Sequence, residues 1–314
     1  MNGLKVFAGS SNPGLTQRIA RYLGVSLGRV RIDQFPDGEL IVKLDDDVRG
    51  RDVFVIQSTC APVNRNLVEL LVFIDCLRRA SSRRITAVLP YFGYARQDRK
   101  DEGRVPISAK LVANLITQAG ADRILTIDLH AAQIQGFFDI PVDHLLAEPV
   151  FSTHFLKTIS EEVVLVSPDV GNVKRARIYA QHLEGDIAVI DKRRISGSEA
   201  VVQNIIGDVR GKHVVMVDDM IATAGTICEA AKLVKSFGCK RVTVGATHPV
   251  LCGPAIERLT SSPVDSLVVT DTIPLDGKTG FGDKHIEVLS VSELLGEAIR
   301  RIHRDESVSS LFLK

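Results

Sequence analysis

The sequence has almost no net charge, no long apolar run and no paired-cysteine motif. Its 39 Lys and Arg residues against 38 Asp and Glu residues leave a formal charge of +1, so it lacks the basic excess typical of general nucleic-acid binders. No stretch reaches the roughly 18 apolar residues that a membrane-spanning helix requires. The best candidate, 67–77, contains Glu69 and Asp75. We therefore expect neither nucleic acid nor a membrane as a partner.

The cysteines and the first residues both favour a cytoplasmic protein. The five cysteines are odd in number and scattered, with no Cys-x-x-Cys pair. This pattern fits reduced thiols better than a disulfide framework or a zinc site. The opening residues, MNGLKVFAGSS, lack a basic region followed by a long apolar one, so we expect no signal peptide.

Strand-like and helix-like patterns alternate along the 314 residues, which are 45% hydrophobic and 25% charged. Short runs rich in Val and Ile are typical of parallel strands buried on both faces. We predict such strands at 53–56, 85–89, 124–127, 163–166, 187–190, 214–217, 242–246 and 267–270. Helices are predicted at 67–79, 108–118 and 225–236. This alternation predicts an α/β protein with mainly parallel sheets flanked by helices.

The two halves of the chain resemble each other. Three pairs of segments repeat at offsets of 161, 157 and 158 residues: 47–56 with 208–217, 84–88 with 241–245, and 32–33 with 190–191. Matches at nearly half the chain length favour a duplicated domain. We place the boundary near 143–150, with one domain at 1–146 and the other at 147–314, and we allow for the last helix packing back on the first domain.

The segment from Asp218 to Thr226 carries the clearest chemical pattern. A buried strand ends in Asp218 and Asp219, and a short loop then leads into a helix. Helix N-terminal amides and threonine hydroxyls suit a phosphate, and a glycine allows close approach of the backbone. The two acids can accept hydrogen bonds from vicinal hydroxyls, so we predict a sugar-phosphate site formed by Asp218, Asp219, Thr223, Ala224, Gly225 and Thr226. The alternative is that the acids only cap a helix, with Thr226 as its N-cap.

Two segments of the first half suit a nucleotide. Arg96 and Gln97 follow the predicted strand 85–89, and their side chains can bind polyphosphate oxygens. Phe35 lies in a Pro/Gly turn with Asp37 and Glu39. There it could stack on a base while the acids accept from an exocyclic amine. Taken alone, Phe35 is better explained by core packing.

Two further groups of residues could bind a metal ion or a polyphosphate. His130 and Asp169 each follow a predicted strand and could hold Mg²⁺ beside phosphate oxygens, although a single His at a strand end also serves as a structural hydrogen-bonding group. The basic run 191–194, followed by the small polar loop 195–199, could close over a polyphosphate. The alternative for this run is a solvated turn.

Together these segments resemble the ribose-phosphate pyrophosphokinase family. The resemblance covers nearly the whole chain and includes FPDGE (35–39), YARQDRK (94–100), DLHAAQIQGFFDIPVDH (128–144), SPD (167–169), DKRR (191–194) and VDDMIATAGT (217–226). It implies two duplicated phosphoribosyltransferase-like domains in a homohexamer. It also implies transfer of the diphosphoryl group of ATP to the 1-hydroxyl of ribose 5-phosphate, which releases AMP.

The resemblance also implies roles for individual positions. The adenine of ATP would be bound from a neighbouring subunit by Phe35, Asp37 and Glu39. Other ATP contacts would come from Arg96, Gln97, Asp98, Arg99 and His130. Mg²⁺ would be held by His130 and Asp169, and Lys192 and Arg194 would stabilise the transferred group. A regulatory site for phosphate as activator and ADP as inhibitor, as in the phosphate-dependent class, would involve Arg49, Ser81, Gln135, Asp143, Ser307, Val308 and Ser309.

Two departures from the family pattern are visible. Ala222 stands where the family usually has Asp, which removes a polar contact from the loop. Asn172 stands where it usually has Gly, and Asn tolerates left-handed backbone better than most residues. Three alternatives stay open: a non-catalytic regulatory homologue, a phosphoribosyltransferase and, more weakly, a DNA-binding regulator.

Overall fold

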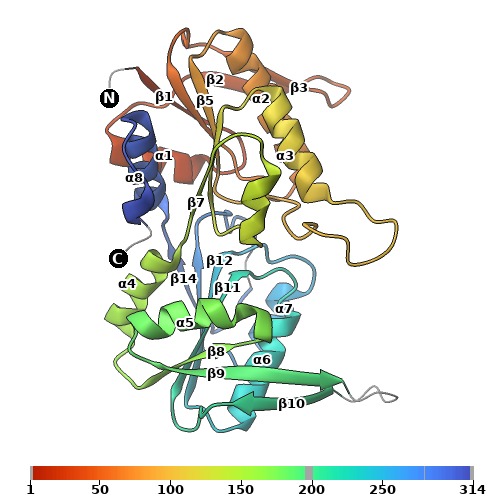
Figure 1. Ribbon diagram of the computed structural model, residues 1–314, viewed down its shortest axis with the longest axis vertical. Coiled ribbons are helices and arrows are strands. Elements are labelled where there is room, and N and C mark those ends of the chain that lie inside the picture. The colour runs from red at the N-terminus through yellow and green to blue at the C-terminus, as the bar shows by residue number, and fades with distance from the viewer. Residues whose placement is uncertain (1–2, 195–200, 279, 312–314) are drawn as a thin grey trace. The chain divides into compact units, whose positions relative to one another are not determined.

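The computed structural model describes residues 3–194, 201–278 and 280–311, with side chains throughout except at 170, 192–194 and 201–203. The chain divides into two compact units (Figure 1). The first comprises Met1–Ala147, Thr272–Pro274 and Ser290–Lys314, and the second comprises Glu148–Asp271 and Leu275–Leu289. The C-terminal residues therefore pack in the first unit, although they follow the second unit in sequence.

The first unit is built on a parallel sheet of five strands in the order β1-β4-β5-β6-β7. These strands are β1 (Leu4–Ala8), β4 (Asp52–Ile56), β5 (Arg84–Leu89), β6 (Arg123–Ile127) and β7 (Val142–Leu145). A separate antiparallel hairpin joins β2 (Val30–Gln34) to β3 (Leu40–Leu44). The helices are α1 (Pro13–Leu23), α2 (Val63–Arg79), α3 (Ser108–Ala119), the short η1 (Ala132–Phe137) and α8 (Ser292–His303), followed by η3 (Ser309–Leu311).

Helices pack in two pairs in this unit. Figure 1 shows α2 beside α3, and their apolar faces share one core with alternate residues of the strands, such as Val53 and Val55. The other pair is α1 with α8, which approach closely because Gly296 has no side chain. A Cβ on Gly296 would lie 2.5 Å from the Tyr22 ring. The C-terminal helix is therefore an integral part of the first unit.

The second unit contains a sheet of seven strands in the order β10-β9-β8-β11-β12-β13-β14. The strands are β8 (Val163–Ser167), β9 (Asp186–Arg194), β10 (Val201–Ile206), β11 (His213–Met220), β12 (Arg241–His248), β13 (Ser266–Thr270) and β14 (His285–Leu289). Only the β9–β10 pair is antiparallel in this sheet. The helices are α4 (Glu148–Thr158), η2 (Val170–Asn172), α5 (Val173–His182), α6 (Gly225–Ser236) and α7 (Ala255–Ser261).

Helices also supply the core of the second unit. The buried face of α6 packs with α7 and with Val214, Met216 and Val244 of the central strands. Phe151 and Phe155 of α4 approach Gly245 of β12, where a Cβ would lie 3.4 Å from each ring. Within the described ranges, no helix combines the length and the apolarity needed to cross a bilayer.

The predicted internal repeat appears in the structure as one recurring set of hydrogen bonds. The Arg49 amide donates to Asp47 Oδ1 and the Arg210 amide to Asp208 Oδ1, each at 3.0 Å. The next glycines, Gly50 and Gly211, have φ values of 67° and 73°. The Gly50 amide donates to the Ser81 carbonyl shortly before β5, and the Gly211 amide donates to the Gly238 carbonyl shortly before β12, each at 2.9 Å. The strand order β1-β4-β5-β6-β7 recurs as β8-β11-β12-β13-β14, which confirms two similar α/β domains.

All eight predicted strands and all three predicted helices are confirmed, with ends that shift by a few residues. One local prediction is wrong. The basic run 191–194 was expected in a loop after a strand ending at Ile190, but β9 continues through Arg194. The reason is the antiparallel partner β10, which pairs from Val201 opposite Arg194 to Ile206 opposite Val189.

A buried ion cluster holds the end of α8 against β4 and β5. The Asp52 side chain is fully buried, and Arg84 donates to it twice, with Nε to Oδ1 at 2.8 Å and Nη2 to Oδ2 at 2.6 Å. His303 Nδ1 lies 2.7 Å from the same Oδ2. Arg84 also donates to the carbonyl of Ile302 at 2.8 Å. One arginine thus joins two strands to the C-terminal helix.

We predict that Arg84→Ala destabilises the protein, because it leaves the buried Asp52 carboxylate with one cation fewer. Removing one partner of such a pair costs about 3 kcal/mol, and urea unfolding should show a decrease of this size. The control is Arg79→Ala, which removes an exposed pair with Asp75 (79% and 47% exposed side chains) and should cost less than about 0.5 kcal/mol. Equal losses in the two variants would contradict this assignment.

Candidate functional site

The second unit has a point where the chain direction across the sheet reverses. From β8 the chain passes through α5 to β9 on one side, and from β11 it passes through α6 to β12 on the other side. The loops that follow β8 and β11 therefore flank one crevice at the carboxyl ends of the strands. In open α/β sheets this is where ligands bind. The sequence placed Asp169 in the first of these loops and the segment from Asp218 to Thr226 in the second.

Asp218 and Asp219 are the last acids of β11, and both are largely removed from solvent. Asp219 is buried, with 5% exposure, and Asp218 is partly buried. Burial and the neighbouring charge of Asp219 raise the pKa of Asp218 to about 7, while Arg175 on α5 opposes the shift. The pair thus holds closely spaced charge that a ligand with hydroxyl donors would relieve.

The loop after the acids ends in a helix N-terminus. Ala224 occupies the N-cap position of α6 with φ 60° and ψ 8°, and its side chain forms no cap hydrogen bond. The first amides of a helix have no partner inside it, so they are available to an anion. Thr226 lies inside α6 and not at its N-cap, and both acids lie on β11. The alternative that this segment is only a helix cap is wrong.

The loop between β11 and α6 is held in place by hydrogen bonds to its backbone. The Leu251 amide donates to the carbonyl of Ile221 and the Cys252 amide to that of Ala222, each at 2.9 Å. Arg258 of α7 donates from Nη1 to the Thr223 carbonyl at 3.1 Å. None of these bonds requires a polar side chain at Ala222, so the loop keeps its shape despite this departure. The sequence gave no signal for Arg258, since its role depends on where α7 packs.

Asp169 lies in the loop after β8 and is exposed. Its Oδ1 accepts a hydrogen bond from the Asn172 amide at 2.9 Å, which caps the turn η2. Asn172 itself has φ −93° and ψ 3°, so the left-handed conformation that Asn tolerates is not used here. An asparagine at this position therefore needs another explanation.

The equivalent loop of the first unit is closed by its own side chains. There, the buried Glu69 of α2 accepts from the Ser10 amide at 2.7 Å and from Gln57 Nε2 at 2.9 Å. Gln57 directly follows β4 and occupies the position that Asp218, near the end of β11, has in the repeat. The Glu69 carboxylate therefore accepts from the Ser10 amide, which follows β1, and from the Gln57 side chain, which follows β4. The strand ends of the first unit are therefore occupied by the protein's own groups, whereas the loop after β11 leads into an open helix N-terminus.

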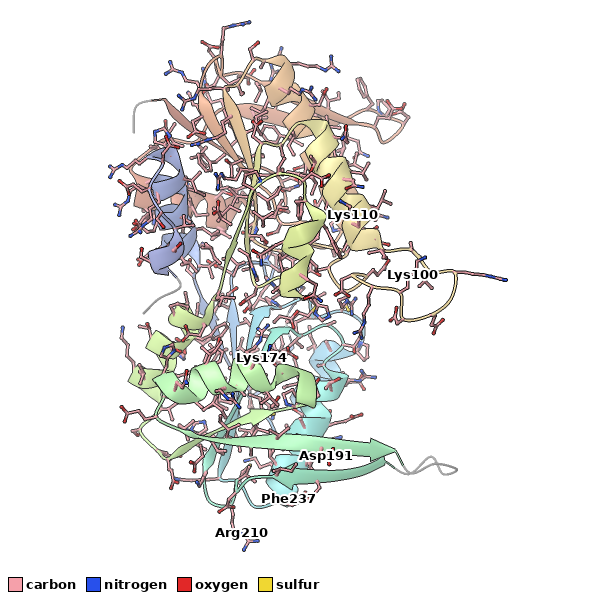
Figure 2. All side chains as sticks on the ribbon, viewed as in Figure 1. Lys100, Lys110, Lys174, Asp191, Arg210 and Phe237 are labelled. Carbon is pink, nitrogen blue, oxygen red and sulfur yellow. The ribbon has the colours of Figure 1, made fainter. Side chains whose placement is uncertain are left out.

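The segment of the first unit that was predicted to bind a nucleotide follows β5. Arg96, Gln97 and Arg99 are exposed there, and Asp98 is partly buried, with Oδ2 accepting from Gln133 Nε2 at 3.4 Å. Gly93 allows this loop to approach β4, because a Cβ on it would lie 2.4 Å from the Thr59 carbonyl oxygen. Figure 2 shows Lys100 farther along the same loop, between β5 and α3. His130 follows β6 and is exposed, so it shares this edge of the sheet.

Phe35, Asp37 and Glu39 lie in the turn of the β2–β3 hairpin. The Phe35 amide donates to the Glu39 carbonyl at 2.8 Å, and Asp37 Oδ1 accepts from the Glu39 amide at 3.1 Å. The Phe35 side chain is 50% exposed, so the alternative of core packing is wrong for this residue. The exposed aromatic ring, in the same turn as two acids, is available to a ligand or to another chain.

The predicted regulatory residues fall into groups at different parts of the first unit. Arg49 and Ser81 are close at the amino edge of the sheet, because the Gly50 amide donates to the Ser81 carbonyl at 2.9 Å. The chain from Ser307 to Ser309 follows α8, whose end is joined to β4 at the same edge. Gln135 follows β6 at the opposite edge, and Asp143 lies in β7, 2.6 Å from Arg123 Nη1. One copy of this unit does not bring the whole set together.

Lys192 and Arg194 belong to the end of β9, and their side chains lie outside the described residues. The loop 195–199 also lies outside them. Figure 2 shows the preceding Asp191 on β9.

Comparison with known proteins supports the architecture along the whole chain. Residues 4–120 match the N-terminal domain of ribose phosphate pyrophosphokinase, and 194–313 match the phosphoribosyl synthetase-associated domain. A ribose-phosphate pyrophosphokinase from Rhodopirellula baltica is 58% identical over 99% of both chains. The chain belongs to the ribose-phosphate pyrophosphokinase family. The family resemblance inferred from the sequence motifs is thereby confirmed.

Other members of the ribose-phosphate pyrophosphokinase family extend the comparison. A protein of this name from Campylobacter jejuni is 53% identical over the full length of both chains. The solved phosphoribosylpyrophosphate synthetase from Mycobacterium smegmatis is 42% identical and superposes with a TM-score of 0.89, covering 97% of this chain and all of that one. Both units described above therefore belong to the family fold.

We predict that Asp218→Asn stabilises the protein at alkaline pH. The folded-state pKa of about 7 lies above the unfolded value of about 4, so the stability of the parent decreases as pH rises between these values. At pH 8 the variant should be more stable by on the order of 1–2 kcal/mol, and near pH 4 the difference should vanish. Thermal unfolding across this pH range measures it. The exposed control Asp283→Asn should show no such trend, and a parent and D218N variant that unfold alike at pH 8 would refute the prediction.

Proposed function

We propose that this protein transfers the diphosphoryl group of ATP to the 1-hydroxyl of ribose 5-phosphate, giving 5-phosphoribosyl 1-diphosphate and AMP. The observation that carries the proposal is the acid pair Asp218–Asp219, which leads directly into the open N-terminus of α6 in a chain that matches its relatives from end to end. This arrangement suits a ligand that combines vicinal hydroxyls with a phosphate.

In the second unit, the proposed substrate is ribose 5-phosphate. Its ring hydroxyls donate to Asp218 and Asp219, and its 5-phosphate accepts from the amides of Thr223, Ala224, Gly225 and Thr226 at the start of α6. The exposed side chains of Thr223 and Thr226 add hydroxyl donors. The left-handed Ala224 supports this assignment, because it turns the backbone immediately before the helix.

In the first unit, the proposed substrate is ATP. The exposed Arg96 and Arg99 supply planar guanidinium groups for phosphate oxygens, with Gln97, Asp98 and His130 beside them on the same sheet edge. Phe35, Asp37 and Glu39 are assigned to adenine across a subunit contact. The exposure of Phe35 supports this assignment, since a ring that packs in its own core could not reach a second copy.

Mg²⁺ is the proposed metal, with Asp169 and His130 as its protein ligands. The part of the chain that the structure describes contains no cluster of three or more His, Cys, Asp or Glu side chains that could hold a metal alone. Mg²⁺ typically uses one or two carboxylates together with water and substrate phosphates. When bound, the ion would neutralise phosphate charge. Asp169 fits this role because it is an exposed carboxylate at the crevice.

The reaction needs no covalent intermediate on the protein. The 1-hydroxyl oxygen attacks the β-phosphorus, the bond from this phosphorus to the oxygen of the α-phosphate breaks, and the hydroxyl proton is lost as AMP leaves. Catalysis then depends on positioning and on stabilising charge. We assign Lys192 and Arg194 to the charge on the transferred group.

We further propose a cytoplasmic homohexamer that phosphate activates and ADP inhibits. The separation of Arg49 and Ser81 from Gln135 within one unit supports an effector site completed by another copy of the chain. The phosphate-dependent class is part of this proposal.

The direct test is an assay of AMP and the diphosphorylated sugar after incubation with ATP, ribose 5-phosphate and Mg²⁺, in phosphate-free buffer and with added phosphate. We expect stoichiometric formation of both products, increased by phosphate. A non-catalytic regulatory homologue would form neither product under any condition. A phosphoribosyltransferase would instead consume the diphosphorylated sugar with a base and form no AMP. Activity that phosphate does not change would refute only the regulatory class.

We predict that Lys192→Ala lowers kcat at least 100-fold while the affinity for ATP changes little, because a charge that acts mainly on the transition state contributes little to ground-state binding. Initial rates and ATP titrations measure the two effects separately. The control Lys232→Ala removes an exposed lysine of α6 and should match the parent. A K192A variant with parental kcat would show that the basic run is only a solvated segment.

A further inference from the structure

The side chain of Asn172 makes contacts unusual for its position. Asn172 is the N-cap residue of α5, a place where Asn ordinarily accepts hydrogen bonds from the amides of its own helix, yet it forms no such bond. Its Nδ2 instead donates to the carbonyl of Val217 at 3.0 Å and to Asp218 Oδ1 at 3.3 Å. The carbonyl of Val217 can only accept, so the amide nitrogen of Asn172 must face these partners. The side chain therefore acts on β11 and not on its own helix.

The backbone of the same residue contacts the other acidic loop. The Asn172 amide donates to Asp169 Oδ1 at 2.9 Å. Pairing between β8 and β11 runs only from His213 to Val215 on β11, so the two strands are no longer paired where their loops begin. Asn172 connects these loops at that place, with its backbone on one and its side chain on the other.

We propose that Asn172 is a positioning residue that sets the orientation of the Asp218 carboxylate for the ribose hydroxyls, and that it keeps this carboxylate in register with Asp169. The inference rests on the proposed function of the crevice. Glycine, which the family pattern usually has here, could supply only the backbone bond to Asp169. Asn172 therefore adds side-chain bonds to β11 that glycine could not form.

The environment of Asp218 explains why such a donor matters. Its Oδ1 accepts from Asn172 and from the amide of Asp219 at 2.9 Å, and two donors on one oxygen restrict rotation of the carboxylate. The acid is partly buried beside Asp219, with Arg175 as the facing cation, and its pKa is already raised. A carboxylate in such a place that loses a donor rotates toward another or takes up a proton. Either change removes an acceptor from the sugar.

Asn172→Asp is the sharpest test, because it keeps the size of the side chain and the backbone bond to Asp169 but replaces two donors with a charge facing Asp218. We expect KM for ribose 5-phosphate to rise at least tenfold while KM for ATP changes less than twofold. Asn172→Ala removes the donors without adding charge and should raise KM for ribose 5-phosphate about threefold. Thermal unfolding of each variant checks that it is folded.

The matched control is Asn114→Asp, the same chemical change at an exposed position of α3, which should leave both KM values at parental levels. Calorimetric titration with ribose 5-phosphate alone separates this inference from the proposed function, because it needs no turnover. A parent that binds the sugar phosphate but forms no AMP would refute the function, while weaker binding by N172D would still support the positioning role.

Three results would overturn the inference. The first is a KM for ribose 5-phosphate in N172D within twofold of the parent. The second is an equal increase of both KM values, which would indicate general distortion of the site. The third is a parent protein that does not bind ribose 5-phosphate in the titration.

Discussion

Two carboxylates held side by side at the end of a buried strand are the constraint on which the second unit depends. Asp218 and Asp219 repel each other where burial already disfavours charge, and the pKa of about 7 for Asp218 reflects both effects. The surrounding residues reduce this cost: Arg175 supplies a positive charge, and Asn172 supplies an amide donor. The acid pair keeps hydrogen-bond acceptors that a ligand with hydroxyl donors could use, so the same feature that lowers stability suits a binding site.

The first unit has the same scaffold as the second but lacks the pair of adjacent acids at the end of its central strand. Different side chains occupy the corresponding strand ends. Both units share the turn before the central strand and the order of their five parallel strands. In the first unit, however, Glu69 accepts from Ser10 and Gln57 at the corresponding strand ends. The Glu69 carboxylate accepts the hydrogen bonds that these donors could otherwise give to a bound anion. The first unit is thus free to present its exposed loops, Arg96 to Arg99 and the hairpin with Phe35, to a different ligand.

Much of the site was predictable because it follows directly from strand ends. Parallel strands direct their carboxyl ends to one edge, so acids and loops that follow Val- and Ile-rich runs must gather there. This logic put Asp169 and Asp218 at the ends of two different strands, and the strand order shows that these strands are neighbours. For Phe35 the sequence left core packing open as an alternative, because the pattern of a single turn does not show whether a ring packs inward, and the exposed ring excludes it. The prediction failed for the basic run 191–194, because its strand character comes from pairing with β10, a contact that local sequence does not encode.

Hydrophobic periodicity, the internal repeat and the motifs after each strand determined from sequence alone the α/β class, the duplication and the family. These properties depend on residues close together in the chain. Only the tertiary structure decided that α8 packs in the first unit through Arg84 and Asp52, that Glu69 closes the first loop, and that Asn172 faces Asp218. Each of these contacts joins residues at least 12 positions apart. Such pairings are selected by the packing of whole elements, because a side chain finds its partner only after the strands and helices that carry it have been placed.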